Sequence, residues 1–507
     1  MKKRRGAIIR SLLVVFLLMC LVLPASVAYA ETPLSLGVVA ASAAADGLGS
    51  PFQHHSFVAD GVMWVFYQGD AVDQILCSWS EDGTTWVAHA PITWCEATTA
   101  ATVGGQFDTW YYVADDTVRF AVVNTSLNNS AIMYASYDVN AVTHVLTIEG
   151  AWRTAVAGVA NVSYRNPTIC VTNNESVFIT YGSVNNSVSD VYVMTTNNST
   201  SVTWLPEVGF PMNNLSANAS RPTMYGSVIP LYTNDNVSVQ YAGYNGSRYK
   251  INQLNINWNG TAWNKDTVYD IDTSGWYLPT GYEWNYNAVS IITHPGLLLT
   301  NNNDVVIQCS QTSGAVYRTF TNSRANESDA WGSSGSYARN FGAGGWASDY
   351  IGAMGMRNAI YSLVYSGWDM SGGSTNIYSN DYDAVTGNWD GIAVVDTDLK
   401  VPFVSTMSDY RYDPAGTGYI GFLYGTTTDD TLMYGLYGPA TTTASTIPAS
   451  VTAMAWIIIL VFGMLICLVL MAYGATSSNG NTELIKAGLT GFLGFVIAAI
   501  IVAATLV

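Results

Sequence analysis

The sequence predicts an all-β protein in which a β-propeller ectodomain of about seven four-stranded blades, with six possible, precedes a C-terminal α-helical transmembrane hairpin. The first indication is a tryptophan that recurs at intervals of 66, 52, 59, 68 and 58 residues. Four short strands and their turns occupy roughly 40 to 60 residues, so each interval suits one sheet, and sheets repeated around an axis form a propeller. The repeated tryptophans are Trp86, Trp152, Trp204, Trp263, Trp331 and Trp389.

The second indication is a hairpin turn that precedes two of these tryptophans. Residues 80–86 (SEDGTTW) align with residues 257–263 (NWNGTAW). Asp-Gly and Asn-Gly favour tight hairpins, because these residues tolerate the positive φ that such turns require. The tryptophan is expected to open the next strand and to bury its ring between neighbouring sheets.

Residues 80–86 resemble a shortened Asp-box, the Ser-x-Asp-x-Gly-x-Thr-Trp turn of sialidases and many other propellers. At the level of the fold, the chain is therefore similar to the sialidase-like, Asp-box (BNR) repeat superfamily. In that family the box is a structural turn between the outer strands of a blade, remote from the active centre. The resemblance assigns structural roles to Ser80, Asp82, Gly83, Thr85, Trp86, Asn259, Gly260 and Trp263.

The remaining strands follow from apolar runs after the sixth tryptophan. Residues 401–407, 419–424 and 432–437 predict three strands, and residues 34–41 could supply a fourth that closes the ring. Eight blades are also compatible with the pattern. A β-sandwich or a stack of small β domains is the alternative fold.

The ends of the chain predict export and membrane attachment. Residues 1–30 combine basic residues, an apolar run and an Ala-x-Ala site, as in a secretory signal peptide. The ectodomain would span 31–438, and 439–450 would form a Thr/Ala/Ser/Pro stalk. Two uncharged runs are long enough to cross about 30 Å of hydrocarbon. They predict helices at 451–473 and 489–507, joined by a short polar turn at 474–488.

Charge excludes one class of partner. The net charge is −17, and removal of residues 1–30 would shift it to −22 because five basic residues and no acidic ones are lost. Nucleic acid is therefore not expected, since no basic patch is available for phosphates. Export permits disulfides, and Cys77 and Cys95 fall within one predicted blade and could form a bridge.

Asparagine is enriched in glycosylation sequons. Between residues 121 and 261, 12 of 22 asparagines begin Asn-x-Ser/Thr, which predicts a glycan coat on predicted blades two to four. The alternative is a loop bias toward Asn, Ser and Thr. The sequons in the chain begin at Asn124, Asn128, Asn161, Asn174, Asn185, Asn197, Asn198, Asn214, Asn218, Asn236, Asn245, Asn259 and Asn326.

Ligands of propellers usually bind over the central channel, so polar residues at blade entrances are candidates. Ligand-binding candidates are His54, His55, Arg165, Arg221, Arg357, Tyr410 and Arg411. A sialidase resemblance implies three arginines that grip a carboxylate and a Tyr activated by a Glu, for which Tyr282 and Glu283 are the catalytic candidates. The family's Arg-Ile-Pro signature is absent, and adjacent strand residues point to opposite faces.

No motif specifies a cofactor. Asp381 and Asp383 followed by Gly387 suggest calcium only weakly, because the loop spacing is incomplete. No set of residues has the spacing of a metal site. The sequence thus predicts a membrane-anchored extracellular glycoprotein of the cell surface or a viral envelope, which binds a carbohydrate or protein ligand for adhesion without catalysis. The alternatives are an envelope spike or surface-layer component, and a sialidase-like glycoside hydrolase or lyase.

Overall fold

The computed structural model divides the chain into two compact units, Met1–Pro439 and Ala440–Val507, and all the residues it describes lie in the first. The described residues are 35–40, 53–68, 74–93, 107–124, 130–172, 174–185, 188–196, 204, 209–212, 226–231, 236–244, 249–270, 289–293, 304–312, 316–324, 336–343, 351–357, 360–369, 374–383, 388–389, 393–396, 404–407, 420–426 and 431–437.

Regular secondary structure in these residues is entirely β, so the predicted all-β class is confirmed for the part of the chain that the structure describes. Within those residues, no helix of the length and hydropathy needed to span a membrane is found. The predicted signal peptide and both predicted membrane helices lie outside the described residues.

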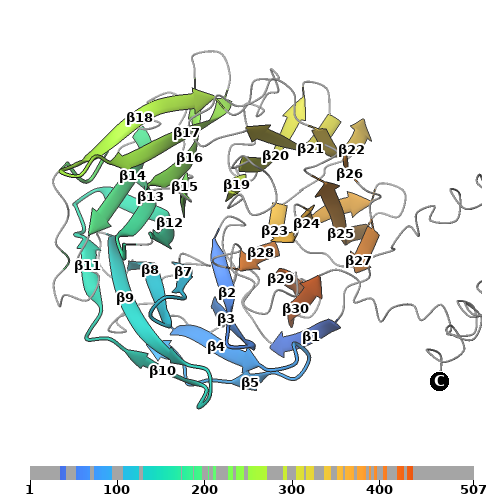
Figure 1. Cartoon of the computed structure of the whole chain (residues 1–507), viewed down its shortest axis with the longest axis horizontal. Coiled ribbons are helices and arrows are strands. Elements are labelled where there is room, and N and C mark those ends of the chain that lie inside the picture. The colour runs from blue at the N-terminus through green and yellow to red at the C-terminus, as the bar shows by residue number, and fades with distance from the viewer. Residues whose placement is uncertain are drawn as a thin grey trace, which may run out of the picture. The chain divides into compact units, whose positions relative to one another are not determined.

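The described strands form antiparallel groups arranged around a common axis, as in a propeller (Figure 1). The first group contains β2 (His54–Ala59), β3 (Val62–Gln68), β4 (Gln74–Ser80), β5 (Val87–Ala88) and β6 (Ile92–Thr93). The second contains β7 (Phe107–Tyr112), β8 (Thr117–Asn124), β9 (Ala131–Asn140), β10 (Val145–Ile148) and β11 (Arg153–Val156).

The third and fourth groups follow in chain order. The third contains β12 (Val162–Val171), β13 (Val177–Asn185) and β14 (Val188–Thr196), and Met212 adds an antiparallel bridge to Val193. The fourth contains β15 (Gly226–Pro230), β16 (Val237–Tyr244), β17 (Tyr249–Trp258) and β18 (Trp263–Asp270).

The remaining strands complete the arrangement. The fifth group contains β19 (Val289–Thr293), β20 (Asp304–Thr312), β21 (Val316–Arg324) and β22 (Ser336–Ala343). The sixth contains β23 (Ile351–Arg357), β24 (Ile360–Asp369), β25 (Ser374–Asp383), β26 (Asn388–Trp389) and β27 (Ala393–Asp396). The seventh contains β28 (Val404–Met407), β29 (Ile420–Thr426) and β30 (Thr431–Tyr437), with β1 (Ser35–Ala40) as its outer strand.

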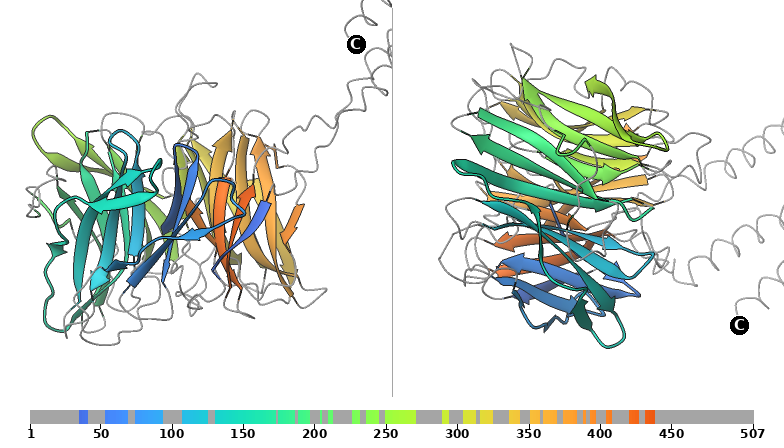
Figure 2. Two further views of the ribbon diagram at one scale, coloured as in Figure 1. Left: turned by 90° about the horizontal axis from the view of Figure 1, so that it is seen from below. Right: turned by 90° about the vertical axis from the view of Figure 1, so that its left-hand side faces the viewer.

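The two ends of the described chain meet in this seventh group. β1 pairs antiparallel with β30, with Ser35 opposite Leu436, and β28 pairs in parallel with β2 of the first group. The first strand of each group lies nearest the axis, and Figure 2 shows the strands standing side by side around it. The inner strands β2, β7, β12 and β15 therefore bring their entry residues to the centre of the unit.

Strand β3 is apolar along nearly its whole length because both of its faces are buried. In β3, Trp64 and Phe66 pack into the core between the first and second groups, whereas Met63, Val65 and Tyr67 pack into the core shared with the seventh. Alternate strand residues point to opposite faces, so a strand covered on both sides is apolar throughout. Ring pairs join the groups: Phe57 stacks on Tyr111 at 4.5 Å, Phe178 meets Trp263 edge-on at 4.8 Å, and Phe66 meets Phe120 edge-on at 5.1 Å.

Cys77 differs from the sequence prediction. Its thiol is free and lies in the apolar core between the first two groups, where burial raises its pKa well above the ordinary value. The expected partner, Cys95, lies outside the described residues. The predicted bridge is therefore not formed in this structure.

Candidate functional site

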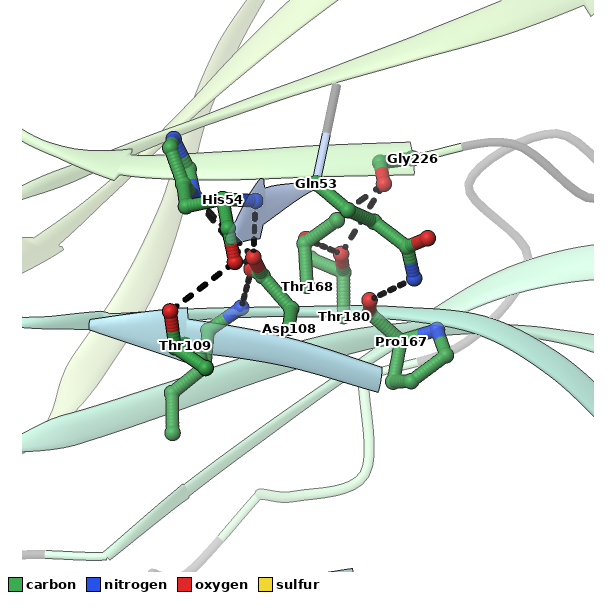
Figure 3. Close-up of polar contacts among 9 residues, drawn as sticks. Gln53, His54, Asp108, Thr109, Pro167, Thr168, Thr180 and Gly226 are labelled. Carbon is green, nitrogen blue, oxygen red and sulfur yellow. Dashed lines mark hydrogen bonds and ion pairs between the residues drawn. The ribbon is translucent and has the colours of Figure 1, made fainter. Parts of the chain in front are cut away.

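The most connected polar side chain at the centre of the described unit is Asp108, the second residue of β7. Its carboxylate is fully buried, and it accepts hydrogen bonds from the backbone N–H groups of two other inner strands. Oδ1 accepts from His54 N in β2, and Oδ2 accepts from Ile169 N in β12 at 2.6 Å (Figure 3). One side chain thus ties three successive inner strands together.

The imidazole of His54 completes this arrangement. Its Nδ1 lies 3.1 Å from Asp108 Oδ1, and only 4% of the side chain is exposed. Because backbone N–H groups occupy both carboxylate oxygens, the carboxyl is the acceptor and Nδ1–H is the donor. This tautomer leaves the lone pair on Nε2, which has no hydrogen-bond partner among the described residues.

Two opposing influences act on the pKa of Asp108. Burial raises the pKa of Asp108, and the neighbouring His54 opposes that shift through charge and hydrogen bonding. Trp110 meets the His54 ring edge-on at 5.4 Å, and Thr109 Oγ1 donates to the carbonyl oxygen of His54 at 2.9 Å. The ring is therefore fixed on several sides, as a general base requires.

A belt of neutral polar groups continues from this pair to the next inner strands. Gln53 Nε2 donates to the carbonyl oxygen of Pro167 at 2.8 Å. The hydroxyls of Thr168 and Thr180 contact each other and lie 3.4 and 3.2 Å from the carbonyl oxygen of Gly226 (Figure 3). One hydroxyl can donate to the carbonyl while the other donates to the first hydroxyl, so the belt is internally satisfied.

His55 does not belong to this cluster. Its ring meets Phe107 edge-on at 4.3 Å and is buried. Burial, and then the charge of His54, lower its pKa to about 3, so the ring is neutral near pH 7. The sequence placed His54 and His55 together as ligand candidates, but successive strand residues face opposite ways.

The other predicted site residues are placed only in part. Arg165 is exposed in β12, with Nε 3.4 Å from Ser163 Oγ. It precedes Pro167, the acceptor for Gln53, by two residues. Arg357 ends β23, but its side chain is not among those described. Arg221, Tyr282, Glu283, Tyr410 and Arg411 lie outside the described residues.

Sequence reasoning missed Asp108 and its polar neighbours. The available signal was a single carboxylate within the aromatic strand sequence FDTWYY, which is buried throughout. A charge in such a strand needs partners, because burying an unpaired charge is costly. Its partners are 54 and 61 residues away in the sequence, so pattern alone does not identify them.

A second ionic cluster, in the second group, was also not predicted. The fully buried guanidinium of Arg119 contacts Asp115 Oδ2 at 2.6 Å, Glu149 Oε2 at 3.4 Å and the hydroxyl of Tyr134 at 3.3 Å. Arg153 lies over the Tyr134 ring at 5.4 Å. The buried arginine is neutralised by partly exposed carboxylates, so this cluster has the character of a structural ion network.

The two aligned turns have closely related geometry. Asp82 Oδ1 accepts from the N–H groups of Thr84 and Thr85 at 2.8 and 2.6 Å, and Trp86 Nε1 donates to the carbonyl oxygen of Gly83. Ser80 Oγ accepts from Gly83 N at 2.8 Å. At 257–263, Asn259 Oδ1 accepts the N–H groups of residues 261 and 262. Gly83 and Gly260 have φ of 72° and 95°.

Described sequon asparagines occur in turns and at strand ends. Asn161, Asn174, Asn185 and Asn259 are exposed, and Asn124 and Asn236 are partly buried. The other sequon positions, Asn128, Asn197, Asn198, Asn214, Asn218, Asn245 and Asn326, lie outside the described residues. Among the described residues, no group of His, Cys, Asp and Glu has the arrangement of a metal site.

Comparisons with known proteins give structural neighbours only. No family model, that of the Asp-box included, and no curated protein matches the chain. A protein of unknown function from Dyadobacter fermentans is similar with a TM-score of 0.43 and 9% identity, covering 81% of this chain and 100% of that one. The polysaccharide lyase Uly1 is similar with a TM-score of 0.45 and 8% identity, covering 80% of this chain and 99% of that one.

A third neighbour is the GH93 α-L-arabinofuranosidase of Fusarium graminearum, solved with arabinobiose, at a TM-score of 0.38 and 13% identity over 65% of this chain and 91% of that one. The structures found are mostly glycoside hydrolases and lyases of propeller-type fold. This finding runs against the predicted non-catalytic adhesion protein, and that prediction is corrected here. The activities named for these structures are those of the neighbouring proteins.

Proposed function

We propose that this protein is a carbohydrate-active enzyme that cleaves a polysaccharide, with His54 as the group that moves the proton. The observation that carries the proposal is the His54–Asp108 pair at the entry of the inner strands. Its Nδ1 is held by a buried carboxylate at 3.1 Å, and its Nε2 has no partner among the described residues. A histidine fixed in this tautomer can act as a general base through Nε2.

Elimination suits these residues better than hydrolysis. Hydrolysis of a glycosidic bond commonly uses two carboxyl groups that flank the bond. Asp108 cannot take either role, because it is fully buried and both oxygens accept backbone hydrogen bonds. In an elimination, His54 Nε2 would take the proton from the carbon next to a uronate carboxylate. A C=C bond would form, the C–O bond to the leaving sugar would break, and the leaving oxygen would take up a proton from water.

Arg165 is the described residue best suited to a substrate carboxylate. It is exposed, and it lies two residues before the carbonyl that anchors Gln53, the neighbour of His54. A net charge of −17 repels anionic polymers at long range, so such a substrate needs a local cation. The same repulsion implies that activity increases with moderate salt, because salt screens it.

The proposal also covers the propeller family, the export and the membrane attachment of the chain. The seven strand groups would be the blades of a sialidase-like, Asp-box propeller, with β1 supplying the outer strand of the last blade. Residues 1–30 would direct export, and residues 451–473 and 489–507 would hold the enzyme on the outer face of a cell or viral membrane. Export and anchoring are supported by the sequence pattern alone.

The test is a comparison of His54→Gln with His144→Gln on the full chain. Each protein is incubated with a panel of neutral and uronate-containing polysaccharides, and both new reducing ends and unsaturated products are measured. Unsaturated products from wild type and His144→Gln, with a loss in His54→Gln, support elimination. Reducing ends without unsaturation would replace elimination by hydrolysis, and no cleavage of any polymer would reject the enzyme proposal.

A further inference from the structure

The two aligned turns differ at their central residue in a way that changes its chemistry. At the first turn Asp82 uses both carboxylate oxygens: Oδ1 accepts two backbone N–H groups, and Oδ2 accepts Thr85 Oγ1 at 3.0 Å. At the second turn a single oxygen, Asn259 Oδ1, accepts Thr261 N at 3.0 Å, Thr261 Oγ1 at 2.9 Å and Ala262 N at 2.9 Å. The amide oxygen of Asn259 thus accepts all three of these bonds, and the backbone N–H of Asn259 also donates to the carbonyl oxygen of Ala262 at 3.1 Å.

The amide nitrogen of Asn259 does not take part in the hydrogen bonds of this turn. Asn259 is exposed, and its Nδ2 makes no hydrogen bond to a described residue. The residue begins the sequon Asn259-Gly260-Thr261, and the Thr261 hydroxyl already contacts the amide oxygen. Modification at Nδ2 would therefore keep the three bonds that form the turn.

Asn236 provides a contrast within the same group of strands. It also begins a sequon, but it is partly buried, and its Oδ1 accepts a hydrogen bond from Trp258 N at 3.2 Å. The hydroxyl residue of that sequon, Ser238, is fully buried and accepts from Gln240 Nε2 at 2.7 Å. In the folded protein, Asn259 is therefore more accessible than Asn236.

An exposed aromatic ring adjoins Asn259. Trp258 is 38% exposed, and it pairs across the hairpin with Trp263, whose ring centroid lies 5.2 Å from its own. At the first turn the equivalent position is Glu81, whose carboxylate pairs with His144 of the next group at 3.2 Å. Aromatic faces pack against the C–H groups of sugars, so the Trp258 indole offers a platform beside the free amide.

We propose that Asn259 carries an N-linked glycan whose first sugar packs on Trp258. In the transfer step, Nδ2 forms a C–N bond to the anomeric carbon of a lipid-linked oligosaccharide. The bond from that carbon to the polyprenyl phosphate or diphosphate breaks, the phosphate leaves, and Nδ2 loses one proton. The glycan then covers the exposed indole and leaves the turn unchanged.

The experiment uses the full chain expressed in a host that glycosylates asparagine, together with Asn259→Asp and Thr261→Ser. Asn259→Asp introduces the residue found at the same position of the first turn and removes the sequon. Thr261→Ser keeps both the sequon and the hydroxyl. Glycopeptide mass spectrometry measures occupancy. Hydroxyl-radical labelling measures exposure of Trp258, with the buried Trp263 as the internal reference.

The expected result is a glycan on Asn259 in wild type and in Thr261→Ser, with several-fold less labelling of Trp258 in wild type than in Asn259→Asp. An unmodified Asn259 would overturn the proposal, whether or not Asn174 and Asn185 are modified. A glycan on Asn259 with equal labelling of Trp258 in wild type and Asn259→Asp would overturn the packing of the sugar on the indole.

Discussion

At the scale of single residues, Asp108 and Asp82 are carboxylates in opposite environments. Asp108 is buried, and burial raises its pKa. Asp82 is exposed and accepts backbone N–H groups, which hold its pKa well below its ordinary value. Hydrogen bonds to a carboxylate favour its charged form, whereas removal from water disfavours it. The two residues therefore affect stability with opposite dependence on pH.

For Asp108, we expect Asp108→Ala to lower the free energy of unfolding by about 3 kcal/mol or more, because two buried backbone N–H groups lose their acceptor. The raised pKa means that the folded state binds the proton more tightly than the unfolded chain. The contribution of this carboxyl to stability therefore falls as pH rises from about 3.9, the unfolded value, through the folded pKa. Urea unfolding at several pH values measures both effects. A stability equal to that of wild type would show that the hydrogen bonds of Asp108 to β2 and β12 do not stabilise the fold.

For His54, we expect His54→Gln to lower kcat by roughly 10²- to 10⁴-fold with a small change in KM, as for loss of a general base. Asp108→Asn should impair the same step through the tautomer of His54. The positioning role of Asp108 predicts a shifted pH profile of kcat/KM in that variant. A drop in kcat with an unshifted profile would assign Asp108 a purely structural role.

At the scale of elements, the hairpin turns were the most predictable part of the chain. Their residues are contiguous, so Asp82-Gly83 and Asn259-Gly260 are recognisable from local chemistry, and Gly83 and Gly260 have the positive φ that such turns require. The strand predicted over 34–41 is present as β1 and pairs with β30. The Asp108 contacts were not predictable, because they join three strands that are brought together only by the packing of separate groups.

The first turn yields a matched pair of substitutions. Asp82→Asn keeps the Oδ1 acceptor, as Asn259 does at the second turn, and we expect a small loss of thermal stability. Asp82→Ala removes the acceptor of two backbone N–H groups and should lower the melting temperature further. The depressed pKa means that the carboxylate stabilises the fold above about pH 3.9 and loses this effect as pH falls through the folded pKa. Equal melting temperatures for the two variants at pH 7 would show that the turn does not depend on this acceptor.

At the scale of the whole molecule, β1 links the first and seventh groups in two ways. It pairs with β30, and its Gly37 lies against the first turn, where an added Cβ would approach Trp86 Nε1 to 2.9 Å and Thr84 Cα to 3.0 Å. Glycine is needed here because backbone atoms occupy the space of a side chain. The same close packing explains why a short N-terminal strand can be held in place.

We therefore expect Gly37→Val to displace β1 and to lower the melting temperature, since valine cannot fit against the turn. Val38→Thr is the matched control, because Val38 is 52% exposed and its side chain points away. Differential scanning calorimetry measures both variants. Equal melting temperatures for Gly37→Val and Val38→Thr would show that the contact with the turn contributes nothing to the fold.

The pairing of β1 with β30 also has a consequence for how the chain folds during synthesis. Ser35 lies opposite Leu436, so β1 is synthesised long before β30, the strand with which it pairs. Contacts so distant in sequence form slowly, because the loop between them must be closed first. Until then both strands present unpaired edges that favour association between chains. We therefore expect that, until β30 has been synthesised, association through β1 is prevented by a chaperone or by rapid folding of the intervening groups.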